Sequence, residues 1–159
     1  MVIPFRESNG DIFAYQGRAF GKEKPKYITI ILDDSVPKIF GLDRVDTTSD
    51  ILVVEGPIDS LFIQNCIAVA QSDLRVPQYK DKAILVPDNE PRNREVIKHI
   101  EKAIDENYRV VVWPDYVRQK DINDMILSGM DALEIMDIIS NNTFQGLSAK
   151  VELQKWKRT

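Results

Sequence analysis

Five acidic side chains follow short apolar runs of this sequence, and their types and spacing suit metal-dependent chemistry. The runs span residues 51–54, 83–86 and 109–113, and the acids that follow them are Glu55, Asp59, Asp88, Glu90 and Asp121. Clustered carboxylates repel one another unless a cation neutralises them, and oxygen ligands together with water select Mg²⁺ or Mn²⁺ over Zn²⁺. Metal ions held in this way neutralise triphosphate charge, activate a nucleophilic hydroxyl and stabilise a leaving pyrophosphate. The acids therefore predict phosphoryl chemistry.

The elements that carry these acids are predicted to form a mostly parallel sheet. From residue 50 onward, apolar runs of strand length alternate with helical stretches, and this alternation is typical of βαβ units covered by helices. Neighbouring parallel strands lie about 4.8 Å apart and end at one edge of the sheet. We expect the acids to converge there. In a D-x-E order on extended chain, Asp88 and Glu90 point to the same side and can share one ion or hold two adjacent ions.

Each acid also has a simpler interpretation as the start of a helix. Asp59, Asp88 and Asp121 each stand where a helix N-cap or first-turn residue would stand, and a carboxylate there stabilises the helix without any chemistry. The clearest helix is residues 91–106, whose apolar side chains fall on one face. The succession of acids at three strand ends favours a shared site over three separate caps.

Composition narrows the class of protein. A chain of 159 residues with 43% hydrophobic and 29% charged residues suits an ordinary globular protein. Its single cysteine, Cys66, and single histidine, His99, are too few for a self-contained zinc site, which needs about four such ligands. No apolar run approaches the roughly 18 to 20 residues of a membrane span, and the first residues lack the pattern of a secretory signal. We therefore expect a cytoplasmic protein without zinc or membrane contact.

The net charge of −4 argues against nucleic-acid binding, but the charge is unevenly distributed. Residues 51–149 carry 16 acidic against 10 basic residues, whereas residues 150–159 carry one acid and four basic residues. A second basic patch spans residues 18–26 and contains Arg18, Lys24 and Lys26. Much of the negative charge therefore belongs to the predicted metal site, and the basic residues gather near the two ends of the chain.

Three segments resemble the Toprim domain, which bacterial and phage primases, topoisomerases and some nucleases share. Residues 53–61, VVEGPIDSL, are similar to its E-G-x-x-D motif, and residues 85–90, LVPDNE, stand where the family carries D-x-D. Residues 120–124, KDIND, resemble the K-D-x-[DN]-[DE] segment of primases. Two departures occur, because Glu90 replaces the usual second Asp and Asn123 replaces an acid that is common in bacterial primases.

The region before residue 50 points to primases among the Toprim proteins. Residues 5–6, 10–18, 25–28 and 39–42 resemble the stretch that precedes the Toprim domain in primase catalytic cores, including those of phage. The resemblance covers roughly residues 3–130. It implies an α/β fold in which a small β-rich primase subdomain precedes a Toprim domain. The expected division is a β-rich subdomain at 1–49, the Toprim domain at 50–142 and a basic C-terminal tail at 143–159.

The resemblance also implies roles for individual residues. Glu55, Asp88 and Glu90 would be the catalytic acids and metal ligands, and Asp59 and Asp121 would support a further ion. Expected contacts to template or nucleotide phosphates are Arg18, Lys24, Lys26, Arg92 and Lys120. The implied cofactor is Mg²⁺ or Mn²⁺.

The function that follows is that of a DNA primase core. Such an enzyme is a DNA-directed RNA polymerase, a nucleotidyltransferase that joins ribonucleoside triphosphates into short RNA primers on single-stranded DNA during replication. Because the chain has no zinc ligands, we expect a replicative helicase, a separate zinc-binding primase domain or both as partners. The sequence suits a minimal core, one piece of a split primase or a fragment. Two other functions stay open, a Toprim nuclease and a non-catalytic nucleic-acid-binding subunit of the replisome.

Overall fold

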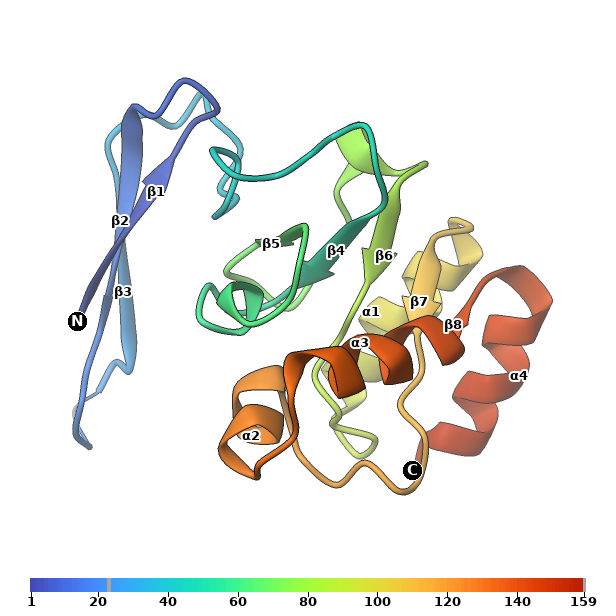
Figure 1. Cartoon of the computed structure of the whole chain (residues 1–159). Coiled ribbons are helices and arrows are strands. Elements are labelled where there is room, and N and C mark those ends of the chain that lie inside the picture. The colour runs from blue at the N-terminus through green and yellow to red at the C-terminus, as the bar shows by residue number, and fades with distance from the viewer. Residues whose placement is uncertain (23, 159) are drawn as a thin grey trace.

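Two β-sheets form the framework of the computed structural model, which describes residues 1–22 and 24–158 (Figure 1). One sheet is antiparallel with strand order β1-β2-β3, and the other has the order β5-β4-β6-β7-β8. The strands are β1 (Val2–Arg6), β2 (Ile12–Arg18), β3 (Tyr27–Ile31), β4 (Ile51–Val54), β5 (Cys66–Ala68), β6 (Ala83–Leu85), β7 (Arg109–Val111) and β8 (Thr143–Phe144).

Helices flank the five-stranded sheet, with α1 behind it and α3 in front of it in Figure 1. The helices are α1 (Arg94–Asp105), α2 (Ile122–Leu127), α3 (Ala132–Asn141) and α4 (Gly146–Trp156), together with the 3₁₀ turns η1 (Asp59–Leu61) and η2 (Pro77–Tyr79). The chain is thus a mixed α/β protein with a mostly parallel sheet and flanking helices, as the sequence predicts. Within the described residues, no helix is long and apolar enough to cross a membrane.

The register of the five-stranded sheet places the ends of its central strands side by side. β4 pairs in parallel with both β5 and β6, and β6 pairs in parallel with β7. All four residues of β4 are buried, which is typical of a central parallel strand covered on both faces. Only β8 runs antiparallel, at the edge. The carboxyl ends of β4, β6 and β7 therefore meet at one edge, as the sequence predicts.

Helix α1 begins three residues later than predicted. Its N-cap is Asn93, whose side-chain Oδ1 accepts hydrogen bonds from the backbone N–H groups of Glu95 at 3.1 Å and Val96 at 3.5 Å. An asparagine in extended conformation satisfies these otherwise free donors, so the helix starts after it. Pro91 consequently lies in the loop between β6 and α1 instead of in the first turn.

The segment 143–159, predicted as a basic C-terminal tail, belongs to the folded domain as far as the structure describes it. It forms β8 and α4, and α4 packs against α1. Ala149, Leu153 and Trp156 recur at helical spacing and are buried, and this apolar stripe holds the helix in place. Basic residues of the segment pair with acids of α1, and Lys150 Nζ lies 2.7 Å from Asp105. The description as a tail is therefore wrong.

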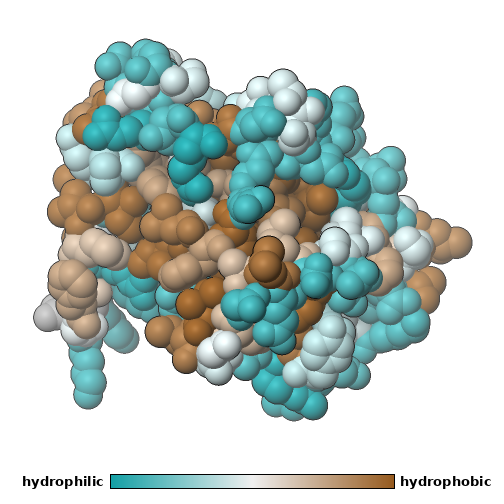
Figure 2. Space-filling view, in the orientation of Figure 1, coloured by the Kyte–Doolittle hydropathy of each residue, from teal (hydrophilic) through white to brown (hydrophobic). Residues whose placement is uncertain are grey.

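The antiparallel sheet carries apolar side chains on both faces. Its inner face buries Ile3, Phe5, Phe13 and Ala14 in one cluster. Its outer side is exposed, and β3 contributes large apolar side chains there that are about half exposed, for example Ile30 at 59%. Figure 2 shows hydrophobic residues gathered over this sheet, at the left of the view. The predicted boundary at residues 49 and 50 falls just before β4, between the two sheets.

Candidate active site

A cavity of about 580 Å³ lies between the two sheets. The five-stranded sheet contributes one wall with most of the predicted acids, and the antiparallel sheet contributes the facing wall with two of the predicted basic residues. Side chains on the first wall include Glu55, Asp59, Asp88, Lys120 and Asp121. Side chains on the second wall include Gln16, Arg18, Lys26, Tyr27 and Thr29. The cavity therefore brings acids and bases from distant parts of the sequence together.

Glu55 follows β4 directly and is partly buried in the cavity wall that the five-stranded sheet contributes. Its Oε1 atom is buried and has no hydrogen-bond partner among the described residues. Burial and the negative charge of Asp88 raise the pKa of Glu55 to about 7, although the backbone N–H of Asp88 donates to its carboxylate. A buried carboxylate with an unpartnered oxygen gains free energy from a cation placed beside it.

Asp88 and Glu90 lie on the same side of their loop, because one ammonium group contacts both. Lys120 Nζ stands 3.2 Å from Asp88 Oδ2 and 3.5 Å from Glu90 Oε1. Burial raises the pKa of Asp88 to about 6, and Lys120 opposes this shift. Lys120, predicted as a phosphate contact, thus pairs with the two acids in this structure.

Asp59 and Asp121 combine a structural role with a place in the cavity wall. Asp121 is the N-cap of α2, and its Oδ1 accepts a hydrogen bond from Asp124 N at 2.8 Å. Asp59 Oδ1 accepts from Asn123 N at 2.9 Å, which ties η1 to α2, and burial raises its pKa. The helix-cap interpretation is correct for Asp121, and it does not remove that residue from the cavity.

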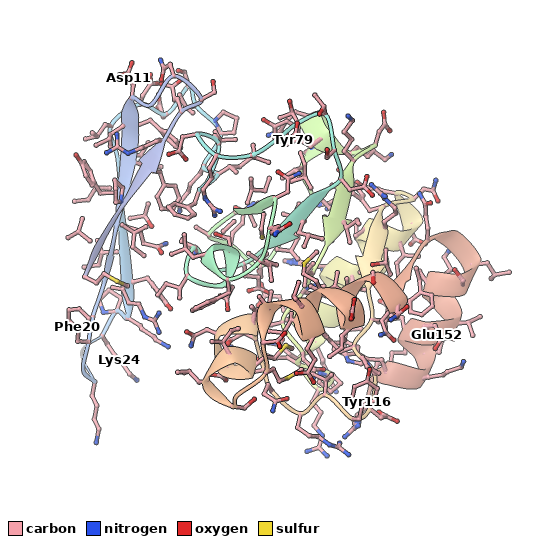
Figure 3. All side chains as sticks on the ribbon, viewed as in Figure 1. Asp11, Phe20, Lys24, Tyr79, Tyr116 and Glu152 are labelled. Atoms are coloured by element: carbon pink, nitrogen blue, oxygen red, sulfur yellow. The ribbon has the colours of Figure 1, made fainter. Side chains whose placement is uncertain are left out.

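The predicted basic residues divide into two groups. Arg18 and Lys26 line the cavity, and each charged group lies 5.6 Å from the ring centre of Tyr27 between them. Lys24 lies at the tip of the hairpin that joins β2 and β3, and Figure 3 shows it away from the helices. Arg92 is exposed in the loop before α1. Neither Lys24 nor Arg92 is among the residues that line the cavity.

Sequence reasoning missed Gln16 on the basic wall. Its side chain is 5% exposed, Nε2 donates to Thr29 Oγ1 at 3.4 Å, and Oε1 has no partner among the described residues. Gln16 stands two residues before Arg18 on β2, so the period-two alternation of a strand places both on one face. That alternation is the signal that could have identified it.

The residues present fit a hard divalent cation that is only partly enclosed by protein. Within residues 1–22 and 24–158, no three acidic, histidine or cysteine side chains are grouped to ligate one ion together. Mg²⁺, however, is usually held through one or two carboxylates, with water and substrate phosphates as its other ligands. Glu55 and Asp88 are neighbouring carboxylates of this kind, and Glu55 Oε1 lacks a partner. Asp59 and Asp121 line the same cavity.

Comparisons with known proteins identify relatives of the whole chain. The DNA primase of Enterobacteria phage T4 is 44% identical over 163 aligned residues, which cover 99% of this chain and 47% of that protein. The chain thus spans about half the length of this curated relative. No family model matches the chain.

Solved structures that share the fold include primase catalytic cores and RNA polymerase domains. The Aquifex aeolicus primase, solved with its zinc-binding and RNA polymerase domains, has a TM-score of 0.68 at 20% identity, over 98% of this chain and 44% of that one. The primase fragment of the bacteriophage T7 primase-helicase has a TM-score of 0.60 at 23% identity, over 87% and 62%. Over the region that it spans, the chain is therefore similar in sequence to a phage DNA primase and shares the fold of primase catalytic cores.

Proposed function

We propose that this chain is the catalytic core of an enzyme that synthesises short RNA primers on single-stranded DNA. The observation that carries the proposal is the cavity in which the carboxyl edge of a Toprim sheet faces Arg18 and Lys26 of the preceding sheet. Polymerisation needs a site for metal-bound triphosphate next to a site for nucleic-acid phosphate, and the two walls supply these chemistries. The phage T4 relative, a DNA primase, supports the same activity.

The side chains have separable tasks in this proposal. Glu55 and Asp88, with Asp59 and Asp121 nearby, would hold one or two divalent ions. Bound Mg²⁺ or Mn²⁺ supplies charge neutralisation for the triphosphate and lowers the pKa of the attacking hydroxyl. Lys120 keeps the carboxylates of Asp88 and Glu90 close together and limits their repulsion.

The opposite wall has the task of binding nucleic acid or nucleotide. Arg18 and Lys26 present positive charge to the cavity, and Tyr27 offers a ring on which a base can stack. Gln16 contributes a buried amide oxygen without a partner among the described residues, which suits a hydrogen-bond donor on a base or ribose. These groups support the assignment of a single-stranded template and ribonucleoside triphosphates as substrates.

Two structural neighbours suggest partner proteins or domains for this chain. One structural neighbour is part of a primase-helicase and another was solved with a zinc-binding domain. A helicase and a zinc-binding primase domain are therefore the partners we propose, either on the same polypeptide or on others. Primer synthesis for replication would take place in the cytoplasm of a bacterial host.

A direct assay tests the proposal. The protein is incubated with single-stranded template, ribonucleotides and Mg²⁺ or Mn²⁺, and short RNA is separated on a gel. Glu55→Gln and Asp88→Asn each remove one carboxylate charge, and we expect primer synthesis to fall at least about a hundredfold. Asp137→Asn, an exposed site on α3 outside the cavity, is the matched control and should retain full activity.

The possible outcomes separate the candidate functions. Primer synthesis that survives the double variant Glu55→Gln, Asp88→Asn would exclude the acidic wall as the catalytic site. Strand cleavage without RNA product would indicate a Toprim nuclease instead. Binding of template without either product, also when a replicative helicase and a zinc-binding primase domain are supplied, would indicate a non-catalytic subunit.

A further inference from the structure

Asn89 lies between the two acids of the D-x-E segment, and its side chain bonds to other parts of the fold. Its Nδ2 donates to the carbonyl oxygens of Val117 at 3.0 Å and Gln119 at 3.1 Å, both in the loop after β7. Its Oδ1 accepts a hydrogen bond from Trp156 Nε1 at 3.0 Å. Both donors and the acceptor of this amide are therefore used, which fixes its orientation.

The backbone of Asn89 joins the same two loops. Its N–H donates to the carbonyl oxygen of Lys120 at 2.6 Å. Lys120 is the residue whose ammonium group contacts Asp88 and Glu90. Because Asn89 fixes the backbone of Lys120 and also lies between the two acids, it sets how the ammonium group and both carboxylates lie relative to one another.

In the loop between β6 and α1, residues 87, 89 and 91 each form a hydrogen bond with another part of the chain. The carbonyl oxygen of Pro87 accepts a hydrogen bond from Trp113 Nε1 at 2.7 Å, and that of Pro91 accepts from the backbone N–H of Arg158 at 2.8 Å. With Asn89 between them, the anchored positions are 87, 89 and 91. The alternate positions 88 and 90 carry the acids that meet Lys120.

Two of these anchors come from the C-terminal part of the chain. Trp156 is 6% exposed and is the last residue of α4, and Arg158 follows it closely. Figure 1 shows the end of α4 beside the loops at the carboxyl end of the five-stranded sheet. The end of α4 therefore reaches the loop that carries the acids.

We propose that Asn89 is a positioning residue for the Asp88–Glu90 pair, and that Trp156 holds Asn89 in the required orientation. In this arrangement α4 controls the affinity of the acidic wall for a divalent cation, although none of its side chains lines the cavity. The inference rests on the proposed function only in assigning the pair to a metal ion, so it can be tested without nucleic acid.

Titration with Mn²⁺ alone, followed by electron paramagnetic resonance, gives the readout. Trp156→Phe keeps most of the ring and removes one hydrogen-bond donor, and we expect the Kd for Mn²⁺ to rise roughly threefold to tenfold. Asn89→Ala removes the whole anchor and should raise it roughly tenfold to a hundredfold. Glu90→Gln shows how much of the Mn²⁺ binding depends on the Asp88–Glu90 pair.

Leu153→Val is the matched control, because it loosens the packing of α4 but leaves the bond to Asn89 in place. We expect it to lower the thermal midpoint at least as much as Trp156→Phe while the Kd for Mn²⁺ stays at the wild-type value. Equal weakening by Leu153→Val and Trp156→Phe would overturn the proposal, because α4 would then act through stability alone. A wild-type signal that does not depend on Glu90 would also overturn it.

Primer synthesis measured against Mn²⁺ concentration separates this inference from the proposed function. Trp156→Phe should need more Mn²⁺ for half-maximal rate and should recover the wild-type kcat at saturating Mn²⁺. A protein that binds Mn²⁺ with the expected dependence on Trp156 but makes no primer would contradict the proposed function and support the role of Trp156 and Asn89. Primer synthesis by Trp156→Phe with an unchanged Mn²⁺ requirement would contradict the anchor alone.

Discussion

Glu55 and Asp88 are held in a state that disfavours their own negative charge. Both are largely buried, and burial is the main cause that raises the pKa of Glu55 to about 7 and that of Asp88 to about 6. Keeping two neighbouring carboxylates at the cavity therefore lowers the stability of the folded chain when both are ionised. Carboxyl groups with raised pKa values in a cavity are typical of functional sites, and here burial is the main cause of the shift.

The pH dependence of stability tests this state. The folded chain holds the Glu55 proton more tightly than the unfolded chain, so the free energy of unfolding should fall as pH rises between about 4.5 and 7. Glu55→Gln lacks this loss and should be more stable than wild type at pH 8, by on the order of 2 kcal/mol, but not at pH 4. Urea denaturation without divalent metal measures the difference. A difference that does not change with pH would contradict the assignment.

Gly56 permits the approach of Asp59 to the acidic wall. A Cβ atom at position 56 would lie 2.3 Å from Asp59 Oδ2, and Asp59 is held by the backbone N–H of Asn123. We expect Gly56→Ala to displace the carboxylate, to cost about 1 to 3 kcal/mol of stability and to reduce primer synthesis. Denaturation and primer assays measure both effects.

A double variant provides the control for Gly56→Ala. In an Asp59→Ala background the added methyl group has space, so the further stability cost should nearly vanish. Equal costs in the two backgrounds would show that the strain lies elsewhere in the chain.

At the scale of single residues, the sequence predicted four acids that line the cavity, but Glu90 is not among the lining residues, and the contacts that hold the acids were not predicted. Glu55, Asp59, Asp88 and Asp121 line the cavity as expected, because strand ends and motif spacing determine their positions. The pairing of Lys120 with the acids depends on the register of β6 against β7, which no local pattern specifies. The assignment of these residues to catalysis stays a prediction until the variants are assayed.

Helix α4 contains buried apolar residues within a segment that its basic residues made resemble a solvated tail. Four basic residues in the last ten suggest a solvated tail, yet Leu153 and Trp156 are buried and hold the helix against the sheet. A helical spacing of apolar residues like that of α1 is present here too, but exposed apolar side chains such as Leu147 and Val151 make it less distinct. Burial depends on a partner surface, in this case α1, that is distant in the sequence.

A comparison of two α4 variants tests the contribution of this helix. Leu153→Ala removes a side chain that is 2% exposed and should lower the free energy of unfolding by about 2 to 4 kcal/mol. Lys155→Ala, on the exposed side, should change it by less than about 0.5 kcal/mol. Urea denaturation measures both values. Similar small effects of the two variants would indicate that α4 is dispensable for the fold.

At the scale of the whole molecule, the cavity exists because two sheets face each other. The antiparallel sheet supplies Arg18 and Lys26, and the bridge between Phe40 and Ala68 joins the intervening segment to β5. The sequence predicted both sheets, but it did not predict which basic residues face the acids. Arg18 and Lys26 belong to paired strands or their ends, whereas Lys24 belongs to the hairpin tip, and only pairing register distinguishes them.

Binding of single-stranded DNA tests the basic wall. Arg18→Gln should weaken binding roughly fivefold to tenfold and reduce the slope of log affinity against log salt by about 0.7, since one phosphate contact is lost. Lys24→Gln is the matched control and should change neither value much, because Lys24 lies outside the cavity lining. Fluorescence anisotropy with a labelled oligonucleotide over a range of salt concentrations measures both. Equal effects of the two substitutions would place the DNA elsewhere.

The opposed charges of the two walls have a consequence for orientation. An electric field runs across the cavity from Arg18 and Lys26 toward Glu55 and Asp88. A bare phosphate is attracted to Arg18 and Lys26, whereas a divalent cation bound to a phosphate is attracted to Glu55 and Asp88. Under the proposed function, the position of the bound cation would therefore orient an incoming triphosphate with its metal at the carboxylates, while the backbone of a template strand, without such a cation, would lie at Arg18 and Lys26.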